Sequence, residues 1–284
     1  IENKPLETIV YQKNNNLSLL TLLKDSLSDI YKSRFLSKQF TIRDIKAQYR
    51  QSYFGILWAF IMPLTTAFVW IFLSSSGTIK LSDTGVPYPV FVFSGTLIWS
   101  IIKEAINTPA SSTNGARGIL SKINFPKEAL VVSGIYKLLF NSAFKIGLLI
   151  ILMIIYKVSF HWTLLLFPFG LVAVIFVGIT IGLILTPLSM LYTDVGKVVN
   201  LTLSFLMYVT PVVYAIPKTG IMKTVMEYNP FTSLILVSRD LLIGGSFEYL
   251  NYYIIVIALC VPLMCMALVW YRLSIPIIVE RLSA

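Results

Sequence analysis

The sequence predicts an all-α membrane protein with six transmembrane helices, an N-terminal amphipathic interface helix, and re-entrant half-helices on the outer face between spans 5 and 6. Composition is the first observation behind this fold class. Of the 284 residues, 56% are hydrophobic and 13% are charged, whereas soluble domains have roughly 25% charged residues. Apolar runs long enough to cross a bilayer recur along the chain. The net charge of +10 comes from basic residues beside these runs, a pattern that favours an anionic membrane surface over nucleic acid.

Residues 1–52 are predicted to form a cytosolic N-terminal region with amphipathic interface helices. Residues 1–16 are polar and rich in Asn, which is typical of a loose terminus. From Ser18 onward, apolar residues at helical spacing alternate with charged residues, which predicts a short amphipathic helix. Thr41 and Asp44 have the spacing of a capping box, so a second helix is expected to begin at Thr41.

The second predicted helix carries two stripes that suit the headgroup region of a membrane. The basic stripe consists of Arg43, Lys46 and Arg50, and the apolar stripe consists of Ile42, Ile45 and Tyr49. A helix of this kind lies in the headgroup plane with its apolar stripe turned toward the lipid. The alternative is a juxtamembrane basic segment that only fixes the topology of the first span.

Residues 53–272 are predicted to form the transmembrane domain. Its spans are expected at about 54–73, 90–108, 129–156, 164–187, 198–214 and 252–271, joined by polar connections such as 109–127. Lys103 and Glu104 interrupt the second span. Lys145, inside the third span, would mark a functional site if buried, but a position in a wet cavity or snorkelling explains it equally well. Gly178 and Gly182 in the fourth span have a spacing that indicates close helix packing.

The segment between the fifth and sixth spans does not fit a crossing helix. Its apolar pieces are too short to cross a bilayer, and Asn229-Pro230 separates them. Residues 217–247 are therefore predicted to be a pair of half-helices that dip into one face, or a surface lid.

The distribution of Lys and Arg predicts the orientation of the chain. Sixteen of these residues lie in the predicted inner segments, five lie in the outer segments, and Lys137 and Lys145 lie within a span. Both termini, including the tail 273–284, are therefore expected in the cytosol, and the half-helix region on the outer face.

Motifs for catalysis are absent from the sequence. The chain has no G-x-x-x-x-G-K-[ST] loop, no HExxH motif and no Cys/His cluster, and it contains one His. The acidic residues are scattered and show no evident intramembrane pair. A hydrolase or transferase needs a base, nucleophile or metal site, so transport or scaffolding is favoured over catalysis. We expect no catalytic residue, and neither a metal nor a cofactor bound by this chain.

Aromatic residues are abundant, with 18 Phe, 15 Tyr and 5 Trp. Most are expected at the membrane interfaces or in packing. A smaller set could line a conduit for sugars, because aromatic faces stack on the apolar faces of pyranose rings. The candidates are Tyr49, Tyr53, Trp58, Tyr208 and Tyr214.

One stretch carries a family likeness. Residues 43–58, RDIKAQYRQSYFGILW, followed by Pro63-Leu64, resemble the start of the membrane subunits of polysaccharide-exporting ABC transporters, which export O-antigen, capsule or teichoic acid. The likeness continues through Phe125-Pro126-Lys127-Glu128, Thr210-Pro211-Val212-Val213-Tyr214, Asn229-Pro230 and Ser238-Arg239-Asp240. The sequence departs from the family pattern at Gln48 and Thr193, where Arg is frequent, and at Phe54, where Leu is usual.

The resemblance implies a homodimer of six-span subunits in the bacterial cytoplasmic (inner) membrane, with two copies of a separate ABC ATPase that binds ATP and Mg. It implies a substrate made of a glycan on a polyprenyl pyrophosphate, and contact with membrane lipid but not nucleic acid. Residues expected to meet the pyrophosphate or couple to the ATPase are Arg34, Arg43, Asp44, Lys46, Arg50, Lys122, Lys127 and Asp194. Ordinary positive-inside residues are the alternative for each basic side chain.

Within this resemblance we expect O-antigen-type export. Export of teichoic acid or capsule, a drug or small-molecule ABC permease, and a membrane enzyme that modifies a glycan lipid remain the alternatives.

Overall fold

The computed structural model describes residues 18–50, 53–76 and 85–283. Across these ranges every regular element is helical. The α-helices are α1 (Leu19–Lys32), α2 (Arg34–Arg50), α3 (Trp58–Ser75), α4 (Tyr88–Gly115), α5 (Arg117–Leu120), α6 (Glu128–Ile155), α7 (Phe167–Leu191), α8 (Thr193–Tyr208), α9 (Ile221–Tyr228), α10 (Pro230–Ile243) and α11 (Leu250–Ser283). Two 3-10 turns, η1 (Gly55–Leu57) and η2 (Trp162–Leu166), precede α3 and α7. The all-helical prediction is confirmed.

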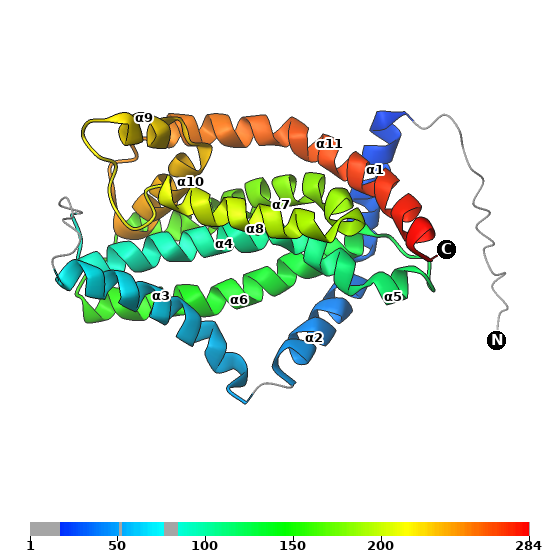
Figure 1. The fold of residues 1–284 in the computed structure, drawn as a ribbon, viewed down its shortest axis with the longest axis horizontal. Helices are drawn as coiled ribbons and strands as arrows, with labels where there is room; N and C mark the ends of the chain where they lie inside the picture. Colours follow the sequence, from blue (N-terminus) through cyan, green and yellow to red (C-terminus); the bar gives the residue numbers. More distant parts are fainter. Residues whose placement is uncertain (1–17, 51–52, 77–84, 284) are drawn as a thin grey trace.

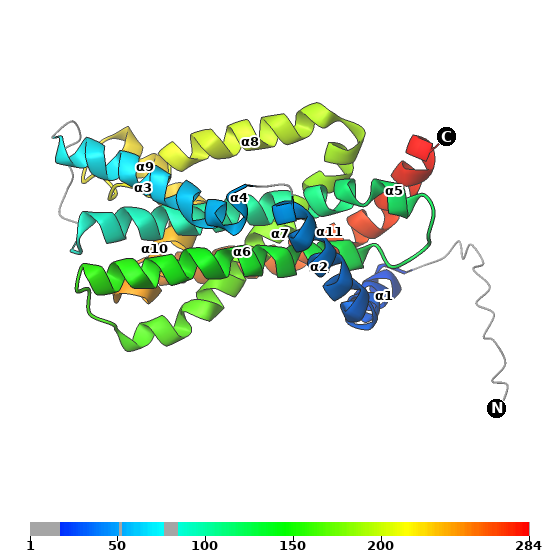
Figure 2. The same cartoon turned by 90° about the horizontal axis from the view of Figure 1, so that it is seen from below.

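The long helices run side by side along the longest axis of the molecule (Figure 1). Helices α1 and α2 gather at one end with α5 and the C-terminal end of α11, which we call the α5 end, while α9 lies at the other end (Figures 1 and 2). Helix α4 is the central element, because its most apolar window is 78% buried, compared with 22–44% for the other three long apolar helices.

Helices α4 and α7 approach closely at two glycines. A Cβ atom on Gly178 would lie 2.5 Å from the Cβ of Ala105, and one on Gly182 would collide with the carbonyl oxygen of Ile106. No larger residue fits without separating the helices, so the GxxxG spacing serves packing, as the sequence indicated.

Four helical segments are long and apolar enough to cross a membrane, namely Tyr88–Gly115, Glu128–Ile155, Trp162–Leu191 and Leu250–Arg281. They match the predicted spans 2, 3, 4 and 6. Helix α3 contains a shorter apolar stretch, Pro63–Leu73, and α8 has 16 residues. Six spans therefore stay a prediction, as does the interface position of α1 and α2.

The predicted start of the second N-terminal helix is wrong. Helix α2 begins at Arg34, and Thr41 lies in its middle. The Thr41 hydroxyl donates to the carbonyl oxygen of Ser37 at 2.8 Å and to that of Ser133 in α6 at 3.2 Å. Ser33, Ser37 and Thr41 are all buried, and their spacing places them on one helical face. Packing of this small-residue face on α6 keeps Thr41 inside the helix, so the capping-box spacing of Thr41 and Asp44 does not mark the start of α2.

The predicted connection 109–127 is also too long. Helix α4 continues through Pro109 to Gly115, where its hydroxyl side chains find partners within the helix and therefore do not end it. The hydroxyls of Thr108, Ser112 and Thr113 each donate to the carbonyl oxygen four residues earlier. The predicted tail likewise continues α11 through Pro276 to Ser283.

The half-helix region forms two short helices, α9 and α10, separated where the sequence indicated. The Asn229 side chain accepts a hydrogen bond from the Phe231 amide at 3.0 Å and so caps α10. Entry of these helices into the membrane stays a prediction.

Candidate functional site

The polar face of α4 lines two cavities. Packing on α7 buries the apolar face of α4, so its polar residues turn toward α2, α3, α6 and α8. The residues of this face that line the two cavities include Ser100, Lys103, Glu104, Asn107, Thr108, Ser111 and Ser112. Such a run of polar residues on the most buried helix is the main candidate for a pathway through the bundle.

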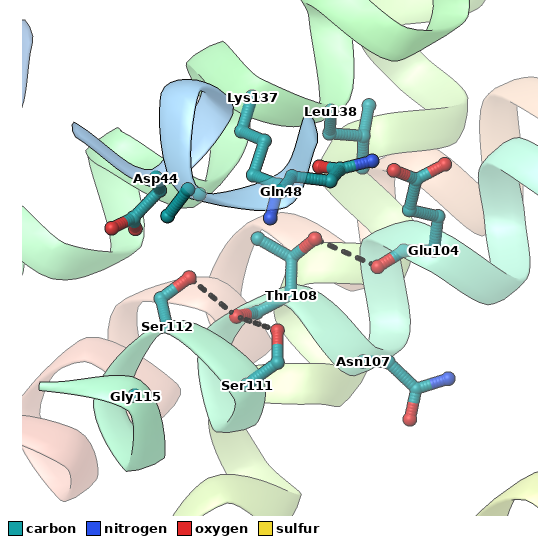
Figure 3. A pocket seen from close by; sticks show the side chains of 12 residues that line it. Asp44, Gln48, Glu104, Asn107, Thr108, Ser111, Ser112, Gly115, Lys137 and Leu138 are labelled. Atoms are coloured by element: carbon teal, nitrogen blue, oxygen red, sulfur yellow. Dashed lines mark hydrogen bonds between the residues drawn. The ribbon is translucent and has the colours of Figure 1, made fainter. Parts of the chain in front are cut away.

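The first cavity, which we call the Glu104 cavity, has a volume of about 530 Å³. Helices α2, α4 and α6 form its walls. Its lining is Asp44, Ala47, Gln48, Glu104, Asn107, Thr108, Ser111, Ser112, Gly115, Gly134, Lys137 and Leu138. Figure 3 shows Gln48 of α2 beside Glu104 and the hydroxyls of α4 below them.

The second cavity, the Lys145 cavity, has a volume of about 410 Å³. It lies between α3, α4, α6 and α8. Its lining is Trp58, Pro63, Thr66, Thr96, Leu97, Trp99, Ser100, Lys103, Lys145, Ser204, Met207 and Tyr208. The wall therefore combines two indole rings, a phenol, hydroxyls and two ammonium groups, with no carboxylate.

An ion pair joins the two cavities. Lys145 Nζ lies 3.0 Å from Glu104 Oε2, and it also donates to Ser100 Oγ at 3.3 Å. Asn141 donates to the other carboxylate oxygen, Oε1, at 3.0 Å. The Lys145 and Glu104 side chains are 14% and 29% exposed. The sequence did not indicate this ion pair, because the partners lie on different helices and only packing of α4 on α6 brings them together.

The aromatic candidates divide into two groups. Trp58 and Tyr208 line the Lys145 cavity together, and the hydroxyl of Tyr214 donates to the carbonyl oxygen of Tyr208. Tyr53 is 99% exposed and packs only edge-to-face on Phe54 among the rings described. The Tyr49 side chain lies outside what the structure describes.

Residues 36–243 match the model of the family described as ABC-2 type transporter.

The chain belongs to the ABC-2 type transporter family.

Two of its relatives are O-antigen export system permease proteins named RfbA. The protein from Myxococcus xanthus is 26% identical over 209 residues, which cover 72% of this chain and 79% of the relative. A protein from Klebsiella pneumoniae is 26% identical over 217 residues, covering 74% and 80%. The resemblance to ABC polysaccharide-exporter permeases is thereby confirmed, and the chain is an integral membrane transport subunit.

In this ABC-2 chain, the predicted coupling residues are spread over the α5 end and do not converge on one site. Arg34 lies 4.6 Å above the ring of Tyr31, and Arg43 pairs with Asp44 at 2.8 Å. Lys46, Arg50 and Lys122 are exposed. Asp194 pairs with Lys197 at 3.0 Å, with both side chains about 80% exposed.

Among the lysines of this set, Lys127 is the one that is partly buried. Its ammonium group donates to Asn124 Oδ1 at 2.8 Å. Burial lowers the pKa of the Lys127 side chain, and the carboxylate of Glu128 partly opposes that shift. Lys127 therefore carries a less hydrated charge than its exposed neighbours in the sequence.

A partly buried charged cluster at the α5 end was not predicted. Arg272 of α11 pairs with Asp29 of α1 at 2.7 Å and with Glu128 of α6 at 2.6 Å. Ser26 donates to the same Glu128 oxygen at 3.0 Å. Three helices that are distant in sequence are thus tied at one point.

A second buried group is Arg239 of α10, which is 2% exposed. Its guanidinium donates to the carbonyl oxygens of Pro211 and Val212 and lies 3.9 Å from the centre of the Phe91 ring. A Cβ atom on Gly95 would collide with this guanidinium. The sequence marked Ser238-Arg239-Asp240 as part of the family likeness but gave no partner for the arginine.

Proposed function

We propose that this chain is the transmembrane subunit of an ATP-driven exporter that moves a lipid-linked, O-antigen-like polysaccharide across the bacterial cytoplasmic membrane. The observation that carries the proposal is the match, over 72–74% of the chain, to O-antigen export permeases. The Lys145 cavity supports it, because aromatic rings beside hydroxyls suit sugars.

In the proposed exporter, two copies of this chain form the channel. Helices α3 and α8 serve as spans 1 and 5, with lengths of about 27 and 24 Å at 1.5 Å per residue. Both helices expose large apolar side chains, which in a dimer would pack against the second copy or lipid. These are Phe68, Val69 and Phe72 on α3 and Val198, Leu201 and Phe205 on α8.

The α5 end is proposed to face the cytosol, with both termini, and to dock on two copies of an ABC ATPase that holds ATP and Mg. Exposed charges suited to such docking gather there, on α2 and at the start of α8. The α9 end then faces outward, with α9 and α10 as the re-entrant half-helices.

Reconstitution of the chain with its ATPase tests the function. We expect lipid-linked glycan to stimulate ATP hydrolysis. Stimulation by small amphiphiles but not by lipid-linked glycan would instead identify a drug permease. Turnover of a glycan lipid by the isolated chain without ATP would identify a membrane enzyme. Comparing O-antigen, capsule and teichoic acid precursors then separates the polysaccharide classes.

Charge reversal on α2 tests the proposed role of the basic stripe. Lys46→Glu and Arg50→Glu should each lower export about tenfold or more, because a charge-assisted contact to the ATPase or to pyrophosphate is worth roughly 1.5–3 kcal/mol. Export of labelled glycan from cells is the measurement, with membrane insertion checked in parallel. Lys157→Glu, an exposed position beyond the other end of α6, is the matched control. Normal export by both α2 variants would leave the stretch as a topology signal only.

A further inference from the structure

The Lys145 cavity holds more positive charge than packing explains. Lys103 and Lys145 both line it, and its lining contains no Asp or Glu. In the described part of the chain, Lys103 forms no ion pair. The charge that balances Lys145 comes from Glu104, which lines the other cavity. An anion inside the Lys145 cavity would therefore meet two ammonium groups.

The position of this charge is unusual for a membrane helix. At 1.5 Å per residue, Lys145 and Glu104 each lie about 15 Å or more from the nearer end of their helix, inside segments that are long and apolar enough to span a bilayer. Ionisable groups at such depth are costly, and they usually mark a pathway for a charged or polar substrate.

The Glu104–Lys145 pair has the geometry of an exchangeable contact. It is a single 3.0 Å contact, and Lys145 remains partly open to the cavity. Glu104 keeps a second partner, because Asn141 binds its other oxygen. An entering oxyanion could take the Lys145 contact while Asn141 still holds the Glu104 carboxylate.

The other cavity residues suit an oxyanion that is attached to a sugar. Lys binds phosphate as a point charge. Trp58, Trp99 and Tyr208 supply aromatic surface beside the ammonium groups, and Ser100 and Ser204 supply hydroxyls. The charge and the aromatic surface lie in one cavity of about 410 Å³, large enough for a sugar unit with its anionic group.

We infer that the Lys145 cavity binds an oxyanion, a phosphate or carboxylate carried by the transported glycolipid, and that Glu104 is the resident counter-ion that this oxyanion displaces from Lys145. This inference rests on the proposed export function. It assigns Lys145, Lys103 and Glu104 to the pathway. The sequence alone was compatible with either a functional or a passive role for Lys145.

The test uses the complete complex with its ATPase in nanodiscs and three short-chain polyprenyl probes. One probe carries N-acetylglucosamine on a pyrophosphate, the second carries glucuronic acid in a glycosidic linkage without phosphate, and the third is a neutral glucoside. The readout is the probe concentration that gives half-maximal stimulation of ATP hydrolysis.

Lys145→Gln should raise the half-maximal concentration for an anionic probe about tenfold or more, and leave the value for the neutral glucoside unchanged. Glu104→Gln should lower the same value for the anionic probe, because it removes the competing carboxylate. Opposite signs distinguish this role from a structural ion pair, whose loss would affect all probes alike. Lys157→Gln, an exposed lysine just beyond α6, is the matched control.

An effect confined to the pyrophosphate probe supports the inference and identifies the carrier as the source of the anion, while an effect confined to the glucuronide identifies the glycan. Equal responses of Lys145→Gln and wild type to both anionic probes would overturn the inference alone. A wild-type complex that responds to none of the three probes would overturn the export proposal as well.

Discussion

Replacing Arg239 with Met should lower the free energy of unfolding in detergent by roughly 2–5 kcal/mol, because two buried backbone carbonyl groups lose their donor. The carbonyl oxygens of Pro211 and Val212 both accept from this guanidinium. Val212 is fully buried, so water cannot readily replace the lost donor. The contact with the Phe91 ring is lost in the same variant.

Thermal unfolding of the purified chain, followed by circular dichroism, is the measurement for Arg239→Met. Arg281→Met, at an exposed position in the last turns of α11, is the control and should stay within about 0.5 kcal/mol of wild type. Arg239→Lys should restore only part of the loss, since an ammonium group lacks the planar fork that reaches two carbonyls. An Arg239→Met variant as stable as wild type would show that water satisfies the segment after α8.

The same contacts explain why the fifth predicted span was misplaced. The apolar run suggested a helix over 198–214, but α8 begins at Thr193 and ends at Tyr208. Residues after α8 turn so that the carbonyl groups of Pro211 and Val212 meet Arg239 on α10. That partner is distant in sequence, so local hydropathy contains no signal for the end of the helix.

The positions of helices that are set by a long apolar run could be predicted from the sequence, whereas contacts between helices could not. Long apolar runs located α4, α6, α7 and α11, because burial in lipid requires a continuous apolar segment. The start of α2 was missed since it depends on burial of Ser37 and Thr41 against α6.

In the candidate site, too, some residues were indicated by the sequence and the contacts between them were not. Of the aromatic residues predicted to line a conduit, Trp58 and Tyr208 lie in one cavity, whereas Tyr53 is exposed. The conduit itself stays a prediction. Lys145 was recognised as exceptional because a lysine within an apolar run is rare. Its partner Glu104 could not be found from spacing, because the two residues meet only through the packing of α6 on α4.

Breaking the charged cluster at the α5 end should release α1 from the bundle. In Arg272→Met, the Glu128 carboxylate loses its cation while only 3% of that side chain is exposed. Leaving one buried charge unpaired costs about 3–5 kcal/mol. The Arg272 and Asp29 side chains are each about a quarter exposed, so solvent screening reduces the expected loss to about 2–4 kcal/mol.

Two effects contribute to this loss of stability: α1 loses its contact with α11 at Asp29, and the Glu128 carboxylate is left unpaired. Hydrogen exchange and a double-mutant cycle separate them. Amide protons of α1 should exchange faster in Arg272→Met, because Asp29 loses its contact with α11. Adding Glu128→Gln should recover part of the stability, since it removes the unpaired charge that causes most of the penalty. Lys197→Met, which breaks an exposed pair, is the control and should leave both measurements unchanged. If Arg272→Met kept wild-type protection in α1, the apolar contacts of Leu22 and Leu23 alone would hold that helix, and the cluster would contribute little to the α5 end.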